Sequence, residues 1–405
     1  FIRDHKMIFD KINIPFWKQS IDPLFKDYDS EKVKGKYLLK LPDLKQIEWE
    51  DFEKFNSYRK ANFIKYSHNN IVANINNFTT GSSFNNQEKK DTIKIIEKKV
   101  LDHKIDYPYS MSDLSQKIFR KSFLEYKIPC LYPYESLKSY HGGKSRIYKK
   151  GLFKNMYLAD IKNAYGSVFM QLPSFYFLDL YKESKKIMDL GIYNIDCDCK
   201  EFEYDYLFDH DFKTQKKLIN IWVTGKELKN AIKYKLINNL KINKGIYYDQ
   251  KTDKQRIISP FKKYADYCLK NNKNKFNKYL INSLYGKLIQ NKKDVSYDTE
   301  NNKIIININA MGLFNPFIAT YITGSIRAKI LEYEIKYKSV HTLTDAIICR
   351  SKPENINKIG KLNIKIKGYL INKKIGVYLI KNKNKIKFGM MGYTKPPFTK
   401  EELKL

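Results

Sequence analysis

With 405 residues, the chain can bury a large hydrophobic core and is expected to hold two or more subdomains, which excludes the small disulfide-dependent scaffolds. Its 76 Lys and Arg residues against 43 Asp and Glu residues give a formal net charge of +33, which favours a polyanionic partner. The alternative explanation of this charge is drift in amino-acid composition, because an AT-rich genome also encodes abundant Lys, Asn, Ile, Tyr and Phe whatever the function. The 32 Tyr and 24 Phe residues interleaved with the lysines supply rings on which bases can stack.

The five cysteines indicate neither a disulfide framework nor a zinc site. They are scattered, and Cys197-Asp198-Cys199 is a lone Cys-x-Cys pair without a second pair or a nearby His, so a reducing compartment fits best. No run of about 18 uncharged apolar residues occurs, and no membrane span is expected. Because the chain begins at Phe1 without the apolar core of a signal peptide, we expect its native start to be missing or removed by processing.

The first 129 residues or so are charged and weakly periodic. A polar, Asn-rich loop is expected over 69–86. A helix is expected over 89–101, where Ile96 and Val100 belong to an apolar stripe.

The middle of the chain contains a glycine pair and a short buried strand. Tyr140-His141-Gly142-Gly143-Lys144 is expected to be a turn, because paired glycines permit positive φ and a close approach of backbone to a ligand. The strand from Met156 to Ala159 should end at Asp160. The mixed segment from about 171 to 254, with a strand over 218–224 and a helix over 227–234, is typical of an insertion between two catalytic elements.

A helix predicted over 273–289 places Lys278, Asn282 and Tyr285 at positions i, i+4 and i+7 of one face. The next helix should begin at Asn315-Pro316, since Asn is a good N-cap and Pro suits the first helical position. Two short strands, over 340–343 and 346–349, should follow and display Asp345 at a hairpin tip.

Asp160 and Asp345 are the candidate catalytic and metal-binding acids. They lie far apart in the sequence, yet a strand end and a hairpin tip of one antiparallel sheet can bring them together. Mg²⁺ prefers hard oxygen ligands and keeps several waters, so two carboxylates that bridge two ions suffice for nucleotidyl transfer. One ion would activate the attacking primer oxygen, and the other would stabilise the leaving pyrophosphate.

These motifs resemble those of the family B DNA polymerases, and specifically the protein-primed branch of phages, adenoviruses and linear mitochondrial plasmids. The resemblance covers roughly Tyr140 to Tyr393. Asp160 to Tyr165 resembles the first palm motif, in which the Asp binds metal and the Tyr closes against the sugar and excludes a ribose 2′-OH. Asp345 resembles the second acid of the paired-acid motif. The resemblance implies an α+β fold: a polymerase right hand with an antiparallel palm sheet, helical fingers, a reduced thumb and a degenerate N-terminal exonuclease-like region.

The remaining matches imply contacts with nucleotide and nucleic acid. Lys278 to Gly286 resembles the fingers motif, in which Lys278 would bind the triphosphate and act in catalysis, while Asn282 and Tyr285 would contact the nucleotide. The implied partners are a DNA template-primer, a dNTP and a terminal protein primer, and the implied cofactor is Mg²⁺. The candidate nucleic-acid contacts are Tyr140, Gly142, Gly143, Gly286, Tyr378 and Lys374.

Several positions depart from the family pattern. Leu343 stands where the family has the first acid of its paired motif, which weakens the expected metal binding without abolishing it. Gly376 stands where the family has the Lys of a Lys-x-Tyr motif, although Tyr378 matches and Lys374 could substitute from two positions earlier. The second insertion and the thumb are both expected to be short.

An active proofreading exonuclease is not expected. Its Asp-x-Glu pattern needs a buried strand, whereas Asp29-Ser30-Glu31 lies in a charged stretch. Asp91, at the opening of an apolar helix, could be a leftover acid of its third motif.

The expected organisation is a degenerate or partial exonuclease-like region over 1–130, the palm start with the template-binding turn and first metal Asp over 131–170, a terminal-protein-region-like insertion over 171–255, the fingers helix and short second insertion over 256–310, the palm with the second metal Asp over 311–380, and a truncated thumb over 381–405.

Three functions stay open. The first is protein-primed, DNA-directed DNA synthesis without proofreading, in a mitochondrion or in a phage-infected cell of low GC content. The second is a catalytically reduced descendant that binds structured RNA in a ribonucleoprotein such as a mitochondrial ribosome. RNA synthesis on the same palm is the third, and Tyr165 argues against it because a bulky ring under the sugar disfavours ribose.

Overall fold

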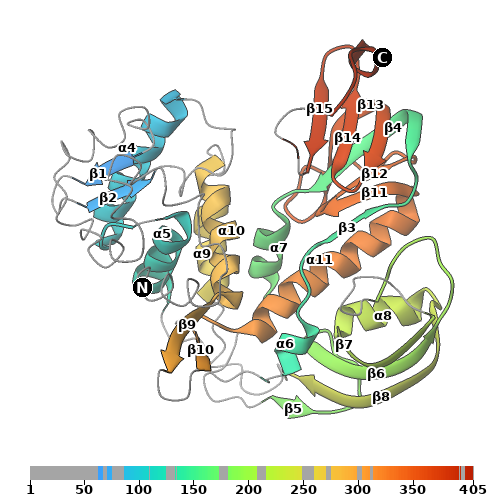
Figure 1. Cartoon of the computed structure of the whole chain (residues 1–405), viewed down its shortest axis with the longest axis horizontal. Helices are drawn as coiled ribbons and strands as arrows, with labels where there is room; N and C mark the ends of the chain where they lie inside the picture. Colours follow the sequence, from blue (N-terminus) through green and yellow to red (C-terminus); the bar gives the residue numbers. More distant parts are fainter. Residues whose placement is uncertain are drawn as a thin grey trace. The chain divides into compact units, whose positions relative to one another are not determined.

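The computed structural model describes two compact units of the chain (Figure 1). One comprises 1–125 and 273–314, and the other comprises 126–272 and 315–405, so that the second unit is interrupted by part of the first. The described residues are 63–66, 71–74, 86–108, 110–124, 133, 135–172, 181–207, 216–248, 260–270, 275–298, 303–310, 313–391, 393 and 397–404.

A seven-stranded antiparallel sheet forms the centre of the second unit, with the strand order β15-β14-β13-β4-β12-β11-β3. The strands are β3 Lys144–Ile147, β4 Gly151–Ile161, β11 Ser339–Thr344, β12 Ala346–Cys349, β13 Leu362–Lys374, β14 Val377–Lys381 and β15 Ile386–Met390. Figure 1 shows β3 and β4, which come from the middle of the chain, beside strands of its last third. A buried cluster that includes Leu158, Ile348 and Leu370 covers the sheet, so apolar burial holds these distant segments together.

Helix α11 (Pro316–Tyr337) is buried along most of its length. Its start is fixed by Asn315, whose side-chain oxygen accepts a hydrogen bond from the backbone N–H of Ile318 at 3.1 Å. α11 packs against β11 and β12 of the sheet and against α7 (Ala164–Gln171) and α8 (Gly225–Lys233). α7 in turn packs against α9 (Pro260–Lys270). A helix surrounded in this way needs apolar residues on every face, which its Ile-rich sequence provides.

A second, four-stranded sheet lies in the same unit, with the order β5-β8-β6-β7. Its strands are β5 Lys182–Glu183, β6 Gly191–Cys199, β7 Lys217–Thr224 and β8 Ile237–Tyr247. Its own core includes Tyr193, Leu207 and Leu228, and α8 covers it. Two short helices, α6 (Glu135–Ser139) and α12 (Lys400–Lys404), complete the elements of this unit.

The first unit is mostly helical. It contains the hairpin of β1 (Phe63–Tyr66) and β2 (Ile71–Asn74), the helices α4 (Asn86–His103), α5 (Met111–Ile118) and α10 (Lys275–Ile289), the π-helical turn η5 (Phe119–Phe123), and the hairpin of β9 (Asn291–Asp298) and β10 (Lys303–Ala310). α5 and α10 pack together, and the Ser115 hydroxyl donates a hydrogen bond to the carbonyl oxygen of Leu280 at 2.7 Å.

Most of the predicted elements are confirmed. The helices predicted over 89–101, 227–234 and 273–289 are α4, α8 and α10, and the strands predicted over 156–159, 218–224, 340–343 and 346–349 are β4, β7, β11 and β12. The helix cap at Asn315 is confirmed as well. Within the part of the chain that the structure describes, no helix is both long and apolar enough to span a membrane.

Three expectations are wrong. The loop predicted over 69–86 contains β2, because the apolar run at Ile71 pairs with β1. Asp91 does not open its helix, since α4 already begins at Asn86. Neither Gly142 nor Gly143 has a positive φ, and the segment before β3 is an extended link instead of a tight turn. The Asp-x-Glu pattern at 29–31 lies outside the described residues.

Candidate active site

Asp160 lies on β4, and Asp345 lies in the hairpin loop that leads into the neighbouring strand β12. Asp160 is near the end of β4 and pairs in register with Ala346 of β12. The backbone N–H of Ile161 donates a hydrogen bond to the carbonyl oxygen of Asp345 at 2.8 Å. The structure therefore brings the backbones of these two candidate acids together, although the acids are far apart in the sequence.

The hairpin that carries Asp345 has a two-residue loop, Thr344-Asp345, closed by the pair Leu343 and Ala346. Thr344 has a φ of +53°, which a two-residue hairpin loop requires but a β-branched residue rarely adopts. A Cβ added to Gly143 would lie 2.2 Å from Cγ2 of Thr344. Gly143 is thus needed for close packing against the hairpin tip, and not for the positive φ that the sequence suggested.

Lys365 is the residue of this site that the sequence did not reveal. Its Nζ lies 2.9 Å from Oδ1 of Asp160, and both side chains are about one-third exposed. The Oδ1 atom itself is buried, yet it accepts no hydrogen bond of regular geometry. The contact with Lys365 is therefore an ion pair whose angles do not suit a hydrogen bond. Lys365 occupies an irregularity of β13, between Ile364 and Ile366, that turns its side chain out of the regular alternation. No motif spacing could have predicted that bulge.

Two tyrosines stand beside the acids. Burial, followed by the nearby charges of Asp345 and Tyr140, raises the pKa of Tyr165 to about 12. Burial and the charge of Asp160 raise the pKa of Tyr378. Both phenols are therefore neutral at physiological pH, and they close the site with rings that can donate a hydrogen bond.

A buried arginine holds the Tyr140–Gly143 segment. Arg327 of α11 is 2% exposed and donates hydrogen bonds from Nη1 to the carbonyl oxygens of His141 and, at 2.9 Å, Gly142. Its Nε and Nη2 donate to the two carboxylate oxygens of Glu227 at 2.7 and 2.9 Å. The Arg327 guanidinium holds the pKa of Glu227 below its usual value although burial opposes this shift. This bidentate pair fixes the link that leads to the Asp345 hairpin.

A buried histidine fixes the turn that leads to Tyr378. The backbone N–H of Gly376 donates to Nε2 of His341 at 3.1 Å, so Nδ1 must carry the proton and donate to Oδ1 of Asn372 at 2.6 Å. Burial lowers the pKa of His341 to about 4. Gly376 has a φ of +68°, which favours glycine and explains why the lysine of the family pattern is absent there.

Lys374, the expected substitute for that lysine, contacts an aromatic ring. It is exposed, and its Nζ lies 4.4 Å from the centroid of the Tyr393 ring. Such a separation is that of a cation–π contact. The lysine that approaches Asp160 is Lys365, from an earlier part of the same strand.

The remaining candidates, Lys278, Asn282, Tyr285 and Gly286, form a second group on α10 of the first unit. Lys278 is exposed, whereas Asn282 and Tyr285 are partly buried. The opposite side of this helix is buried through Leu280, Leu284 and Leu288. A Cβ added to Gly286 would meet nothing within 4 Å, so packing does not demand a glycine there.

The donor set for a metal ion is small. Among the described residues, no group of three His, Cys, Asp or Glu side chains could hold a metal ion. Asp160 nevertheless lies next to the hairpin tip that carries Asp345, and the buried Oδ1 of Asp160 is contacted by the Lys365 ammonium without an aligned hydrogen bond. Two carboxylates fit a Mg²⁺ that takes its other ligands from water and substrate, provided that the Lys365 ammonium withdraws.

No protein-family model matches the chain, and no curated protein matches it. Solved structures do. One, titled as Phi29 DNA polymerase complexed with primer-template DNA and incoming nucleotide, is 14% identical, with a TM-score of 0.57, over 96% of this chain and 71% of that one. The chain has a DNA-polymerase-like fold. The orthorhombic crystal form of the same polymerase gives 16% identity and a TM-score of 0.53. A complex of it with single-stranded DNA gives 14% identity and a TM-score of 0.55, and there the match spans 61% of that polymerase's length.

Proposed function

We propose that the chain is a DNA-directed DNA polymerase of the protein-primed family B type, which elongates a primer on a DNA template from dNTP. One observation carries this proposal: Asp160, near the end of β4, lies next to the tip of the β11–β12 hairpin that carries Asp345, in a polymerase-like fold. The net charge of +33 suits a template-primer duplex. A terminal protein as primer and a mitochondrial or phage setting belong to the same proposal.

Asp160 and Asp345 would hold Mg²⁺, which supplies charge stabilisation for the attacking oxygen and the leaving pyrophosphate when it is bound. Tyr165, beside Asp345, would exclude a ribose 2′-OH, and its neutral phenol adds no charge next to the triphosphate. On α10, Lys278 would neutralise the triphosphate, and Asn282 and Tyr285 would contact the nucleotide.

The segment with Tyr140, Gly142 and Gly143 would position the template strand. Its support is the buried Arg327, which binds the carbonyl oxygens of this link and thereby keeps it rigid. Tyr378 would contact the primer end, because its ring lies close enough to Asp160 for that charge to raise its pKa.

Primer extension tests the proposal. The purified chain should extend a labelled primer on a DNA template in the presence of Mg²⁺, and Asp160→Asn should abolish extension. Asp198→Asn, which removes a carboxylate from β6 of the other sheet, is the matched control and should extend normally. Extension by Asp160→Asn at the rate of the unchanged protein would refute the assigned role.

One observation favours a second function, namely a polymerase descendant that binds structured RNA in a ribonucleoprotein without catalysis. Lys365 is ion-paired with Asp160, and Leu343 replaces an acid, so the site carries less negative charge than two-metal chemistry prefers. Structured RNA that co-purifies with the native chain, together with no extension activity, would support this function. A chain that purifies free of RNA and extends primers would exclude it.

A further inference from the structure

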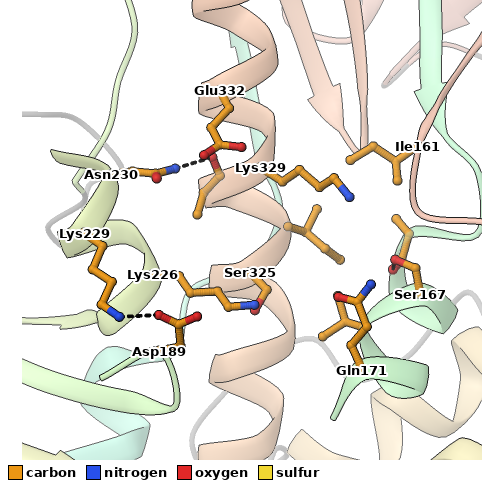
Figure 2. Close-up of a pocket in the computed structure, with 14 residues that line it drawn as sticks. Ile161, Ser167, Gln171, Asp189, Lys226, Lys229, Asn230, Ser325, Lys329 and Glu332 are labelled. Carbon is orange, nitrogen blue, oxygen red and sulfur yellow. Dashed lines mark hydrogen bonds and ion pairs between the residues drawn. The ribbon is translucent and has the colours of Figure 1, made fainter. Parts of the chain in front are cut away.

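The second unit contains a pocket whose lining includes neither Asp160 nor Asp345. Its volume is about 300 Å³, near the lower limit for small-molecule sites. Three helices form it: α7 contributes Ser167 and Val168, α8 contributes Lys226, and α11 contributes Ser325 and Lys329. Figure 2 shows Lys226 extending from α8 and Lys329 extending from α11 toward α7.

The charges in the pocket are unbalanced in favour of cations. Its two carboxylates are both neutralised, Asp189 by Lys229 at 2.5 Å and Glu332 by Lys233 at 3.3 Å. The two other lysines that line it are not ion-paired with any carboxylate of the described residues. A partly enclosed site with surplus positive charge favours an anionic ligand.

Lys226 and Lys329 are held in place by groups that leave their charge uncompensated. Nζ of Lys226 lies 4.7 Å from the centroid of the Tyr321 ring. Nζ of Lys329 donates a hydrogen bond to the carbonyl oxygen of Gly360. Burial, aided by the charge of Lys361, lowers the pKa of Lys329, although the charge of Glu332 opposes the shift. An anion in the pocket would stabilise the charged form of this lysine.

A buried hydroxyl supplies an independent sign of a ligand. Ser325 is 7% exposed and lines the pocket, yet its Oγ makes no hydrogen bond with any described residue. An unpaired buried hydroxyl costs free energy, and a bound acceptor would satisfy it. Ser325 and Lys329 are four residues apart on α11, so both lie on the helix face that lines the pocket.

The rest of the lining is part apolar and part polar, and Gln171 and Asn230 are its polar members. Ile161, Val168 and Ile326 contribute side chains without charge, and the space exceeds what a bare phosphate needs. We propose that this pocket binds one nucleotide unit, with its phosphate monoester at Lys226, Lys329 and Ser325 and its base against the apolar wall. The unit is either a free mononucleotide or the 5′-phosphorylated end of a strand. Neither Asp160 nor Asp345 is part of the lining, although Ile161, the neighbour of Asp160, is.

Calorimetric titration tests the site. We expect dAMP to bind and deoxyadenosine not to bind, since only the former carries the phosphate. Ser325→Ala and Lys226→Gln should each weaken dAMP binding about tenfold or more, because each removes a charge-assisted contact. Lys241→Gln, an equal charge change at an exposed position of β8, is the control and should bind normally.

Oligonucleotides distinguish the two sources. If Ser325→Ala weakens the binding of a 5′-phosphorylated oligothymidylate more than that of its 5′-hydroxyl counterpart, the ligand is a strand end. If Ser325→Ala weakens only the binding of dAMP, the ligand is a free nucleotide. Binding of dAMP that is unchanged in both variants, or absent at millimolar concentration, would overturn the proposal. Asp160→Asn should bind dAMP normally, so failure of the polymerase proposal and failure of this one are distinguishable. Without ligand, Ser325→Ala should raise the thermal midpoint slightly or leave it no lower, because it removes a buried hydroxyl that bonds to no described residue.

Discussion

Replacement of Lys365 by glutamine should increase the affinity of the Asp160 site for divalent cations. The lysine ammonium lies 2.9 Å from Oδ1 of Asp160. At that separation two unit charges attract by about 1.4 kcal/mol in bulk water and by about 6 kcal/mol at an effective dielectric constant of 20. Both side chains are about one-third exposed, so solvent screening and lysine rehydration cancel much of the larger value. We expect the variant to gain about 1 to 2 kcal/mol in metal binding, or about five- to thirtyfold.

Binding of Mn²⁺, followed by electron paramagnetic resonance of the free ion, measures this change without any need for activity. Lys367→Gln is the matched control, because it removes one positive charge from the same strand while its Nζ lies over the Tyr157 ring. Asp160→Asn in the Lys365→Gln background should cancel the gain. Equal Mn²⁺ affinity in Lys365→Gln and in Lys367→Gln would refute the idea that Lys365 competes with the metal.

Three further outcomes are expected. The free energy of unfolding should be highest above about pH 6.5 and fall by up to about 3 kcal/mol toward pH 4, because protonated Nε2 of His341 would face the N–H of Gly376. Denaturant titrations at varied pH measure this slope, and His341→Gln should lack it. Arg327→Met should lower the free energy of unfolding, measured in urea, by about 3 to 5 kcal/mol, because it leaves the buried Glu227 carboxylate without its ion-pair partner. Adding Glu227→Leu to that variant should recover part of the loss. If the chain extends primers, Tyr165→Val should raise ribonucleotide incorporation, and unchanged incorporation would contradict the sugar-excluding role.

The sequence predicted those parts of the fold that depend on local pattern. Asn315 caps α11 because its side chain meets a donor three residues later, a relation that spacing alone contains. The two aspartates could be paired in advance, since Asp160 follows a short apolar run, Asp345 precedes one, and both runs were expected to enter one sheet. The resemblance supplied the order of the motifs, and the fold likeness to solved polymerases agrees with it.

The rest depends on tertiary contacts without a local signature. Arg327 lies in the middle of an apolar helix, and its partner Glu227 is 100 positions away in the chain. Gly143 looked like a turn glycine, but its requirement comes from the Thr344 side chain across the sheet. Lys365 is one lysine among many, and only a strand irregularity directs it to Asp160.

Two residues decide the charge of the site around Asp160. Leu343, expected from the sequence to stand in the place of an acid, packs against the apolar cluster of the sheet, while Lys365 adds a cation next to Asp160. Polymerase chemistry then requires Lys365 to release Asp160 when a metal ion binds, whereas a purely binding role requires no such exchange. Because the ion pair is partly exposed and lacks hydrogen-bond alignment, the structure opposes release only weakly. Catalysis at this site is therefore compatible with Lys365, and the gain in metal affinity of the Lys365→Gln variant measures how strongly the lysine competes with the metal ion.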